Sequence, residues 1–282
     1  MDITAGIVGL GYVGGAIKYA VPLAETYDIN PTIETTCNSL AQLVERVGVV
    51  YICVPTPMTP SGQCDTSIVE SVVDEIARLT DHKIIIIKST VPPGTTKKLQ
   101  EKYPSHDILF SPEFLTEANY KDDYLNQKVM LVGYIGEKRS LIASSALIFQ
   151  LHHIEETQYA TIIDATVAEF YKYVANTFLA TKVSFANEMA SLAKKLDVDW
   201  NKISEIVRYD NRLGRTHWHV PGPDGHLGFG GTCFPKDLSA IRTVAKLLEV
   251  DTPILDAVER RNVSIDRPEK DWQELKGRAV SE

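Results

Sequence analysis

The sequence GLGYVG at residues 9–14 decides the fold of the first half of the chain. An apolar, β-prone run precedes it at residues 3–8, and residues 16–20 after it have a helical composition. Glycines in the pattern GxGxxG make the tight turn from strand to helix and let a pyrophosphate approach the free N–H groups of the helix start. A lone GxGxxG is a weak signal, but the strand before it and the helix after it are the required context. We therefore predict a Rossmann-like, dinucleotide-binding unit.

An acidic side chain should follow about 20 residues after the first glycine, at the end of the second strand. Asp28 stands at this distance from Gly9, in the stretch TYDINP at residues 26–31. A carboxylate there binds the ribose hydroxyls and repels a 2′-phosphate, so Asp28 favours NAD as the cofactor. The alternative is a turn residue before Asn30 and Pro31, and the spacing favours the ribose role.

Further apolar runs in the first half predict strands that are buried on both faces, as in a parallel sheet. They lie at residues 47–54, 84–87, 108–110 and 128–132. Apolar residues at helical spacing predict helices at 65–79 and 141–151. The predicted fold class is α/β, with a Rossmann-like doubly wound parallel sheet. Pro55 and Thr56 end one strand, and Thr90 follows another, at the edge where a cofactor would bind.

The second half begins with residues 157–196, which contain neither glycine nor proline. Apolar residues recur along this stretch at helical spacing, which predicts one long central helix. We expect the helix to bridge two domains and to form a dimer interface. Shorter helices are predicted at 198–207, 237–250 and 252–263, and the charged residues 266–282 have a weak helical pattern whose end is expected to fray. The predicted domains are residues 1–156, an NAD-binding domain, and residues 157–282, the long helix with a helical substrate and dimerisation domain.

The stretch GFGGTCFPKD at residues 228–237 carries candidate chemistry. Its three glycines permit tight turns and the close approach of a ligand. Lys236, one helical turn from Cys233, would favour the nucleophilic thiolate, and Asp237 is placed to move a proton. The alternative is a glycine-rich loop with Cys233 as a small buried residue. These ten residues alone leave both interpretations open.

Two further pairs of residues are candidates for a site. Lys172 and Asn176 are four residues apart in the predicted long helix, so they share a face on which a cation and an amide can stabilise an oxyanion. On its own, that pair favours a solvated helix face. Glu113 and Glu117 are also four residues apart, and on a helical turn two neighbouring carboxylates raise one pKa toward that of a general base. In isolation, an exposed acidic loop is the favoured alternative.

The length and amino-acid composition exclude several classes of protein. The 282 residues are 44% hydrophobic and 23% charged, as in soluble globular proteins, and this length favours two domains. The net charge of −8 argues against a general affinity for nucleic acid or for anionic membranes. The four cysteines lack CxxC or Cys/His spacing, so we expect no metal site, no disulfide framework and a reducing cytoplasm. We expect neither a signal peptide nor a membrane span.

Several of these motifs occur together in the nucleotide-sugar 6-dehydrogenases, and the chain resembles that family. The matching pieces are GLGYVG at 9–14, STVPPGT at 89–95, SPEFL at 111–115, Lys172 with Asn176, and GFGGTCFPKD at 228–237. They occur in the family's order and span nearly the whole chain. The resemblance implies the four-electron oxidation of a nucleotide sugar, UDP-glucose to UDP-glucuronate, with two NAD⁺ used in sequence. Together with the long helix, it predicts a homodimer.

The resemblance also implies roles for single residues. Cys233 matches the nucleophile that captures an aldehyde as a thiohemiacetal and then forms a thioester. Lys172 and Asn176 match the pair that stabilises oxyanions and the attacking water, and Asp237 matches the acid/base that works with Lys172. Two further catalytic candidates, Thr90 and Glu117, match residues around the hydrolytic water, and Glu113 matches a second glutamate to which the base role is sometimes given. The implied cofactor-binding residues are Gly9, Gly11, Tyr12, Val13, Gly14, Asp28, Pro55, Thr56, Thr90 and Lys236. The implied substrate-binding residues are Phe114, Leu115, Lys172, Asn176, Arg212, Phe229 and Gly230.

The chain departs from the family's pattern in two places. The family continues into a second Rossmann-like domain that binds the nucleotide, and we expect this chain to lack it. The loop between Arg212 and Cys233 is longer than usual, and we expect Arg215 and Trp218 in this loop to contribute part of the missing nucleotide contacts. Arg212 resembles an arginine that reaches the substrate of the partner subunit.

Other functions stay open at this point. The chain is also compatible with a 6-dehydrogenase of UDP-N-acetyl-hexosamines or GDP-mannose. A two-electron dehydrogenase of 2- or 3-hydroxy acids would share the Rossmann unit and the long helix but would need no cysteine. A non-catalytic binding protein is a third class. The sequence argues against it, because it keeps the full set of Cys233, Lys172, Asn176 and Asp237.

Overall fold

The computed structural model describes residues 4–281 and divides the chain into two compact units. The first is built from the residues up to Thr56 together with Thr66–Lys172, and the second from Pro57–Asp65 and the residues from Tyr173 onward. The boundary between the units therefore falls inside a helix, directly after Lys172. The domains expected from the sequence, 1–156 and 157–282, stay a prediction.

The first unit contains a seven-stranded sheet in the order β2-β1-β3-β4-β5-β6-β7. The strands are β1 Ala5–Val8, β2 Glu25–Tyr27, β3 Val49–Ile52, β4 Ile84–Ile87, β5 Asp107–Phe110, β6 Val129–Tyr134 and β7 Tyr159–Asp164. Neighbours from β2 to β5 are parallel, and β6 and β7 are also parallel to each other. The α/β, Rossmann-like fold class is confirmed. The expectation of an all-parallel sheet is wrong at one pair, because β5 and β6 are antiparallel.

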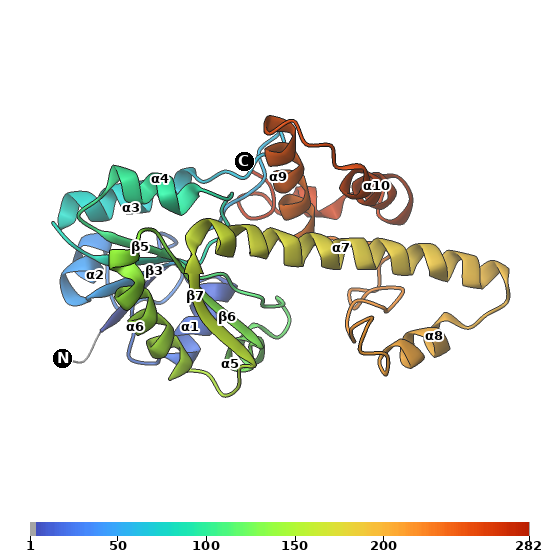
Figure 1. The fold of residues 1–282 in the computed structure, drawn as a ribbon, viewed down its shortest axis with the longest axis horizontal. Coiled ribbons are helices and arrows are strands. Elements are labelled where there is room, and N and C mark those ends of the chain that lie inside the picture. The colour runs from blue at the N-terminus through green and yellow to red at the C-terminus, as the bar shows by residue number, and fades with distance from the viewer. Residues whose placement is uncertain (1–3, 282) are drawn as a thin grey trace. The chain divides into compact units, whose positions relative to one another are not determined.

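Helices cover both faces of this sheet (Figure 1). They are α1 Tyr12–Ala20, α2 Leu40–Arg46, α3 Ser67–Leu79, α4 Thr95–Lys102, the 3₁₀ helix Glu137–Arg139, α5 Tyr120–Leu125 and α6 Ser140–Leu151. Successive strand residues point to opposite faces, so Val50 packs in the core that α2, α3 and α4 close, while Tyr51 packs in the core beneath α1, α5 and α6. Strands β1 and β3 are thus buried on both sides, which explains their continuous apolar runs.

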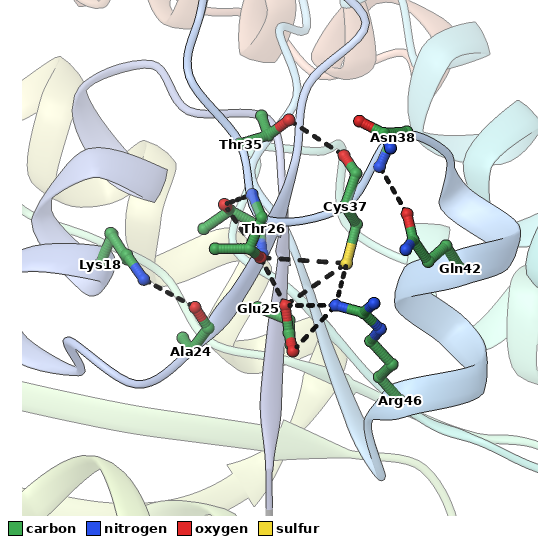
Figure 2. Close-up of polar contacts among 10 residues, drawn as sticks. Lys18, Ala24, Glu25, Thr26, Thr35, Cys37, Asn38, Gln42 and Arg46 are labelled. Atoms are coloured by element: carbon green, nitrogen blue, oxygen red, sulfur yellow. Dashed lines mark hydrogen bonds and ion pairs between the residues drawn. The ribbon is translucent and has the colours of Figure 1, made fainter.

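The connection from β2 to α2 is fixed by a small polar network (Figure 2). The Cys37 N–H donates to the Thr26 carbonyl at 3.0 Å, and the Thr36 hydroxyl donates to Glu25 Oε2 at 2.5 Å. Arg46 Nη1 lies 3.4 Å from Glu25 Oε1. The hydrogen bond from the Thr36 hydroxyl lowers the pKa of Glu25, although burial opposes this effect. Burial raises the pKa of the Cys37 thiol. Cys37 is therefore a structural, unreactive cysteine.

The second unit is helical. It contains α7 Ala165–Lys195 from Tyr173 onward, α8 Trp200–Val207, α9 Phe234–Leu247, α10 Pro253–Arg261, the π-helix Asn262–Asp266 and the 3₁₀ helix Asp271–Glu274. One apolar cluster joins Ala180, Phe229 and Leu238, and a second contains Val207 and Trp218. Within the described residues, no helix is long and apolar enough to cross a bilayer.

Two predictions about the second half were wrong in part. The long helix begins at Ala165 rather than at 157, because residues Tyr159–Asp164 pair along their whole length with β6. The segment after 266 is not frayed. Trp272 and Ala279 are buried, and the Ser281 N–H donates to the Met58 carbonyl at 2.8 Å. These partners are distant in sequence, so local charge patterns could not reveal them.

Candidate active site

The glycine-rich turn has the geometry of a phosphate-binding loop. Gly9 adopts φ +87°, and a Cβ there would lie 2.8 Å from the Cys53 carbonyl oxygen. At Gly14 a Cβ would lie 1.9 Å from the Gly9 carbonyl oxygen, so both positions require glycine. At Gly11, the N-cap of α1, nothing lies within 4 Å of a Cβ position, and no side chain caps the helix. This helix start fits a pyrophosphate, because no side chain caps it and the space beside Gly11 is open.

Asp28 follows the last residue of β2 and is partly buried. Its Oδ2 accepts a hydrogen bond from the Leu10 N–H at 2.6 Å, and its Oδ1 accepts from the Asn30 N–H at 2.8 Å. The carboxylate therefore stands beside the glycine-rich turn, where a ribose would follow the pyrophosphate. It also forms the turn before Pro31, so the two interpretations of Asp28 are compatible in one side chain.

The other predicted cofactor contacts are spread over both units. In the first unit, Tyr12 stacks on Tyr120 with ring centroids 5.5 Å apart, Val13 is half-buried, Pro55 is exposed and Thr56 is buried. Thr90 is buried in the segment between β4 and α4. That segment is anchored by Glu169, whose carboxylate accepts from the N–H groups of Gly94 and Thr96 at 2.5 and 2.8 Å. Lys236 belongs to the second unit and is described below.

Lys172 and Glu113 form a buried ion pair in the first unit. Lys172 Nζ donates to the Glu113 carbonyl oxygen at 2.5 Å and to its Oε1 at 2.9 Å. Lys172 is 3% exposed and Glu113 is 8% exposed. The Lys172 side chain also lies over the Phe114 ring, 5.3 Å from its centroid. The solvated helix face, which the sequence favoured for Lys172, is therefore wrong.

The predicted carboxylate pair is also wrong. Glu113 and Glu117 do not lie on one helical turn, because α5 begins only at Tyr120. Glu113 is buried whereas Glu117 is exposed. Burial by itself would raise the pKa of Glu113, but the Lys172 ammonium and the Leu115 N–H together hold that pKa below its ordinary value. Glu113 is thus a carboxylate at neutral pH, and its proximity to Lys172, not to Glu117, decides its charge.

Cys233 is the N-cap residue of α9 in the second unit. Its side chain is partly exposed, and the Thr232 hydroxyl lies 3.7 Å from its Sγ. A helix start carries partial positive charge, which favours a thiolate over a thiol. Pro235 lies within the first turn of α9, where its missing N–H costs no hydrogen bond. The local sequence therefore places the thiol at a helix end suited to anionic sulfur.

A polar chain continues from this helix start. Asp237, 1% exposed, accepts from Asn176 Nδ2 at 2.6 Å and pairs with Lys236 Nζ at 2.5 Å. Burial would lower the pKa of Lys236, but the Asp237 carboxylate and the thiols of Cys233 and Cys64 raise it above its ordinary value. Lys236 is thus a fixed cation within electrostatic reach of Cys233. Its ammonium contacts Asp237.

The glycines before Cys233 are packed against side chains from the end of the chain. Asn262 holds both backbone polar groups of Phe229, with N···O distances of 2.8 Å. A Cβ at Gly228 would lie 2.2 Å from Asn262 Oδ1, and a Cβ at Gly230 would lie 2.6 Å from the Arg267 guanidinium carbon. Arg267 in turn pairs with Asp224 and Asp271. At least part of the glycine content of this stretch therefore serves packing.

The predicted substrate contacts have mixed environments. Phe114 packs edge-on against Tyr171, and the Leu115 N–H is occupied by Glu113 Oε2 at 2.7 Å. Phe229 is a core side chain of the second unit. Arg212 has an 88% exposed side chain that pairs with Asp210 at 2.6 Å.

Trp218 corrects the expectation for the long loop. It is 7% exposed, packs against Phe185, and its Nε1 donates to the Gly214 carbonyl at 2.9 Å. The indole is therefore a packing residue and is not displayed for a nucleotide. Arg215 in the same loop is exposed.

The second unit also contains a cavity of about 700 Å³. It lies against α9 through Pro235, Leu238 and Ser239, and Phe229 and Trp272 form part of its wall. Neither Cys233 nor Asp237 lines it, so this cavity is separate from the candidate chemistry. Among residues 4–281, no three His, Cys, Asp or Glu side chains are grouped so that they could hold a metal ion.

Sequence analysis missed three supporting residues. Lys88 is fully buried directly after β4. The sequence feature that could have revealed it is a lysine directly after four consecutive isoleucines. Glu169 is 0% exposed on α7 and looked like an ordinary polar helix residue. Asn262, which fixes Phe229, stands in a segment without any motif.

Comparison with known proteins agrees with this geometry. Residues 23–152 match the NAD-binding domain of the UDP-glucose/GDP-mannose dehydrogenase family, and residues 166–264 match the central domain of that family. The UDP-glucose 6-dehydrogenase TuaD of Bacillus subtilis is 33% identical over 263 residues, which are 88% of this chain and 54% of that protein. The UDP-glucose 6-dehydrogenase of Pseudomonas aeruginosa is 36% identical over 240 residues, 79% of this chain and 50% of that protein.

Solved structures show the same relationship. A UDP-glucose dehydrogenase from the archaeon Pyrobaculum islandicum matches with a TM-score of 0.80 and 29% identity, over 93% of this chain and 68% of that one. A 3-hydroxyisobutyrate dehydrogenase from Mycobacterium tuberculosis matches with a TM-score of 0.69 and 16% identity, over 92% of this chain and 91% of that one, and so shares the fold alone. The chain spans about half the length of the curated relatives it matches.

Three findings indicate the same family. Two of its domain models match the chain in series, a relative is one-third identical over most of the chain, and an NAD-type glycine turn is followed by Asp28. The first unit is an NAD-binding domain of Rossmann type. The chain belongs to the UDP-glucose/GDP-mannose dehydrogenase family.

Proposed function

We propose that the protein oxidises the C6 alcohol of a nucleotide sugar to a carboxylate, with UDP-glucose as substrate and NAD⁺ as the oxidant. The observation that carries this proposal is the position of Cys233 at the start of α9, one turn from the buried chain of Lys236, Asp237 and Asn176. A simple alcohol dehydrogenation does not need a nucleophile. A thiol on a helix start, with a cation and a carboxylate nearby, suits covalent capture of an aldehyde.

The proposed chemistry has four stages. The C6 alcohol loses a hydride and a proton, and Cys233 Sγ then adds to the aldehyde carbon to give a thiohemiacetal. Loss of a second hydride and proton leaves a thioester, and water cleaves its C–S bond to release the carboxylate and restore the thiol. Bound NAD⁺ accepts one hydride in each oxidation, so two are reduced per sugar.

Each proposed role is assigned to named residues. Asp237 accepts and returns the proton at Sγ and at the attacking water, since its carboxylate is already oriented by Asn176 and Lys236. Lys172, held by Glu113, stabilises the negative charge that develops on the C6 oxygen. Thr90 and Glu117 are proposed to border the hydrolytic water. Asp28 and the glycine-rich turn hold the ribose and pyrophosphate of the cofactor.

The protein is further proposed to act as a homodimer. Four large apolar side chains of α7 within the second unit are exposed at helical spacing, Val174, Phe178, Phe185 and Leu192, and the exposed Leu196 directly follows the helix. Exposed apolar rows of this length are typical of surfaces that pair with another protein, and a second copy presents the same row. On this view Arg212, which is exposed and paired with Asp210, contacts the partner's substrate. A cytoplasmic location stays a prediction from cysteine usage.

One experiment tests the reaction type and the substrate together. The protein is incubated with NAD⁺ and a panel containing UDP-glucose, two UDP-N-acetyl-hexosamines, GDP-mannose and a 3-hydroxy acid, and NADH formed per substrate consumed is measured. Two NADH per UDP-glucose supports the proposal, and two per another sugar corrects the substrate. One NADH per 3-hydroxy acid would favour the two-electron class, whose fold this chain shares. Absence of NADH with every compound would overturn the proposal.

A further inference from the structure

Lys88 is a buried lysine that the proposed chemistry does not use. It directly follows β4 and is 2% exposed, although a lysine normally extends its ammonium to water. Its Nζ donates to the Ser111 hydroxyl at 3.1 Å, the Pro112 carbonyl at 3.3 Å and Gln150 Oε1 at 3.4 Å. All three acceptors are neutral. A buried ammonium with only neutral partners is costly, so this arrangement calls for an explanation beyond filling space.

The acceptors of Lys88 form the base of the turn that carries Glu113. The Ser111 N–H continues the sheet by donating to the Ile87 carbonyl at 2.9 Å, and the Ser111 hydroxyl also donates to Gln150 at 3.1 Å. Gln150 is 1% exposed on α6. Ser111 is therefore fixed from the strand side and from the helix side, and the ammonium of Lys88 joins the two.

Two lysines then hold consecutive carbonyl groups of one turn. Lys88 donates to the carbonyl of Pro112, and Lys172 donates to the carbonyl and the carboxylate of Glu113. Rotation of the peptide between Pro112 and Glu113 would break the Lys88 contact and would change the φ angle of Glu113, the residue that carries both acceptors of Lys172. The orientation of Glu113, and with it the position of Lys172 Nζ, is thus tied to Lys88.

We propose that Lys88 is a positioning residue for Lys172: it clamps the Pro112 carbonyl so that Glu113 presents both of its oxygen acceptors to the Lys172 ammonium. The consequence for activity rests on the proposed function, whereas the clamp itself does not. No covalent step is assigned to Lys88, and it need not touch the substrate.

The electrostatic surroundings agree with this role. The titratable groups that face Lys88 are Cys53 after β3, Glu113 after β5 and Lys172 on α7. Burial, with a smaller contribution from Lys172, lowers the pKa of Lys88 to about 8 despite the opposing effects of Cys53 and Glu113. Burial raises the pKa of Cys53 to about 12, so this thiol stays neutral beside the ammonium. Lys88 therefore carries its charge at neutral pH and loses it in mildly alkaline solution, where the clamp weakens.

The first test compares variants at the two ends of β4. Lys88→Met removes the charge and the donors, and Lys88→Arg keeps both. Lys83→Met is the matched control, because Lys83 at the other end of the same strand also donates to two backbone carbonyls, at 2.7 and 2.8 Å. With UDP-glucose and NAD⁺, we expect kcat to fall roughly tenfold or more in Lys88→Met, with the KM for NAD⁺ changed less than about twofold. Lys83→Met should stay within about twofold of the wild-type kcat.

The pH profile of kcat distinguishes a positioning role of the Lys88 ammonium from a role in which the side chain only fills space. The alkaline limb of the wild-type kcat profile should lie near pH 8, and Lys88→Arg should move it upward, because a guanidinium does not lose its proton in this range. An unchanged limb in Lys88→Arg, or a wild-type kcat in Lys88→Met, overturns the proposal. Lys88→Arg keeps the test decisive if the methionine variant does not fold.

A second measurement does not depend on activity. Urea unfolding midpoints are determined for the wild type, Lys88→Met, Glu113→Gln and the double variant. If Lys88 positions the Glu113 turn, the midpoint shift caused by Glu113→Gln should be at least halved in the Lys88→Met background. Equal shifts in both backgrounds contradict the proposal. If no nucleotide sugar is oxidised, the proposed function fails while this thermodynamic result still stands for or against the clamp.

Discussion

The candidate residues fall into two clusters that are held in different ways. In the first unit, Lys172 and Glu113 lie at the carboxyl edge of the sheet, buried among strands and helices whose apolar cores fix them. In the second unit, Cys233 is partly exposed at a helix start, and polar side chains such as Asn262 fix the loop that leads to it. The first cluster depends on the core and the second on hydrogen bonds between loops. Breaking the Lys172–Glu113 pair should therefore cost stability, and replacing Cys233 should cost reactivity.

The largest expected effect is at Cys233. Cys233→Ser replaces the sulfur nucleophile by a hydroxyl that is far less acidic, so capture of the aldehyde should fail. We expect steady-state NADH formation from UDP-glucose to fall by about 10³-fold or more, while the urea midpoint changes little because the side chain is only partly buried. Absorbance at the NADH wavelength and urea unfolding measure the two effects.

Cys64→Ser is the matched control for that variant. Cys64 belongs to the same unit, is also partly buried, and is likewise within electrostatic reach of Lys236. Its replacement should leave turnover within a few-fold of the wild type. Undiminished turnover in Cys233→Ser would remove the covalent mechanism and leave the two-electron class.

The second prediction breaks the buried pair of the first unit. Lys172→Met leaves the Glu113 carboxylate buried without its ammonium partner, with a hydrogen bond from the Leu115 N–H. Removal of one member of a buried ion pair costs about 3–5 kcal/mol of unfolding free energy, which urea unfolding at pH 7 would measure. The double variant Lys172→Met/Glu113→Gln should recover part of this loss, since it leaves no unpaired charge. A loss below about 1 kcal/mol in the single variant would show that the pair is solvated.

The pH dependence of that loss has a definite sign. Lys172 keeps the pKa of Glu113 below the ordinary value of 4.5. A carboxyl whose pKa is lowered on folding stabilises the fold above its unfolded pKa, and this contribution disappears as the pH falls through the folded pKa. The difference between wild type and Lys172→Met should therefore be largest near neutral pH and should shrink below about pH 4.5.

The two clusters also differ in how much of them the sequence reveals. The geometry of the glycine-rich turn and of Asp28 could be predicted because it is local, a tight turn and an acid at the next strand end. The pairing of Lys172 with Glu113 joins residues far apart in sequence, so local spacing suggested Glu117 instead. Strand β7 was missed because a stretch without glycine or proline fits a helix equally well until its partner β6 is known.

The third prediction separates packing from backbone strain in the loop before Cys233. Gly228 and Gly231 have nearly the same φ, +65° and +71°, but a Cβ at Gly228 meets Asn262 Oδ1 at 2.2 Å whereas nothing lies within 4 Å at Gly231. Gly231→Ala should cost about 1 kcal/mol through its positive φ alone. Gly228→Ala should cost about 2–4 kcal/mol, because Asn262 must move and release both backbone groups of Phe229. Equal losses in urea unfolding would mean that Asn262 yields freely.

The smallest effect on folding is expected at Arg212 in the second unit, whose side chain is 88% exposed. Its pair with Asp210 lies in solvent, and exposed pairs contribute little, so Arg212→Ala should leave the urea midpoint unchanged. Arg208→Ala, an exposed arginine of the same unit, serves as the control. If Arg212 reaches the partner's substrate, the KM for UDP-glucose should rise several-fold in Arg212→Ala but not in Arg208→Ala. If the Arg212→Ala and Cys233→Ser variants are mixed, turnover should then be restored only in dimers in which an intact Cys233 on one subunit meets an intact Arg212 on the other. Equal KM values for UDP-glucose in the wild type, Arg212→Ala and Arg208→Ala would place Arg212 outside the site.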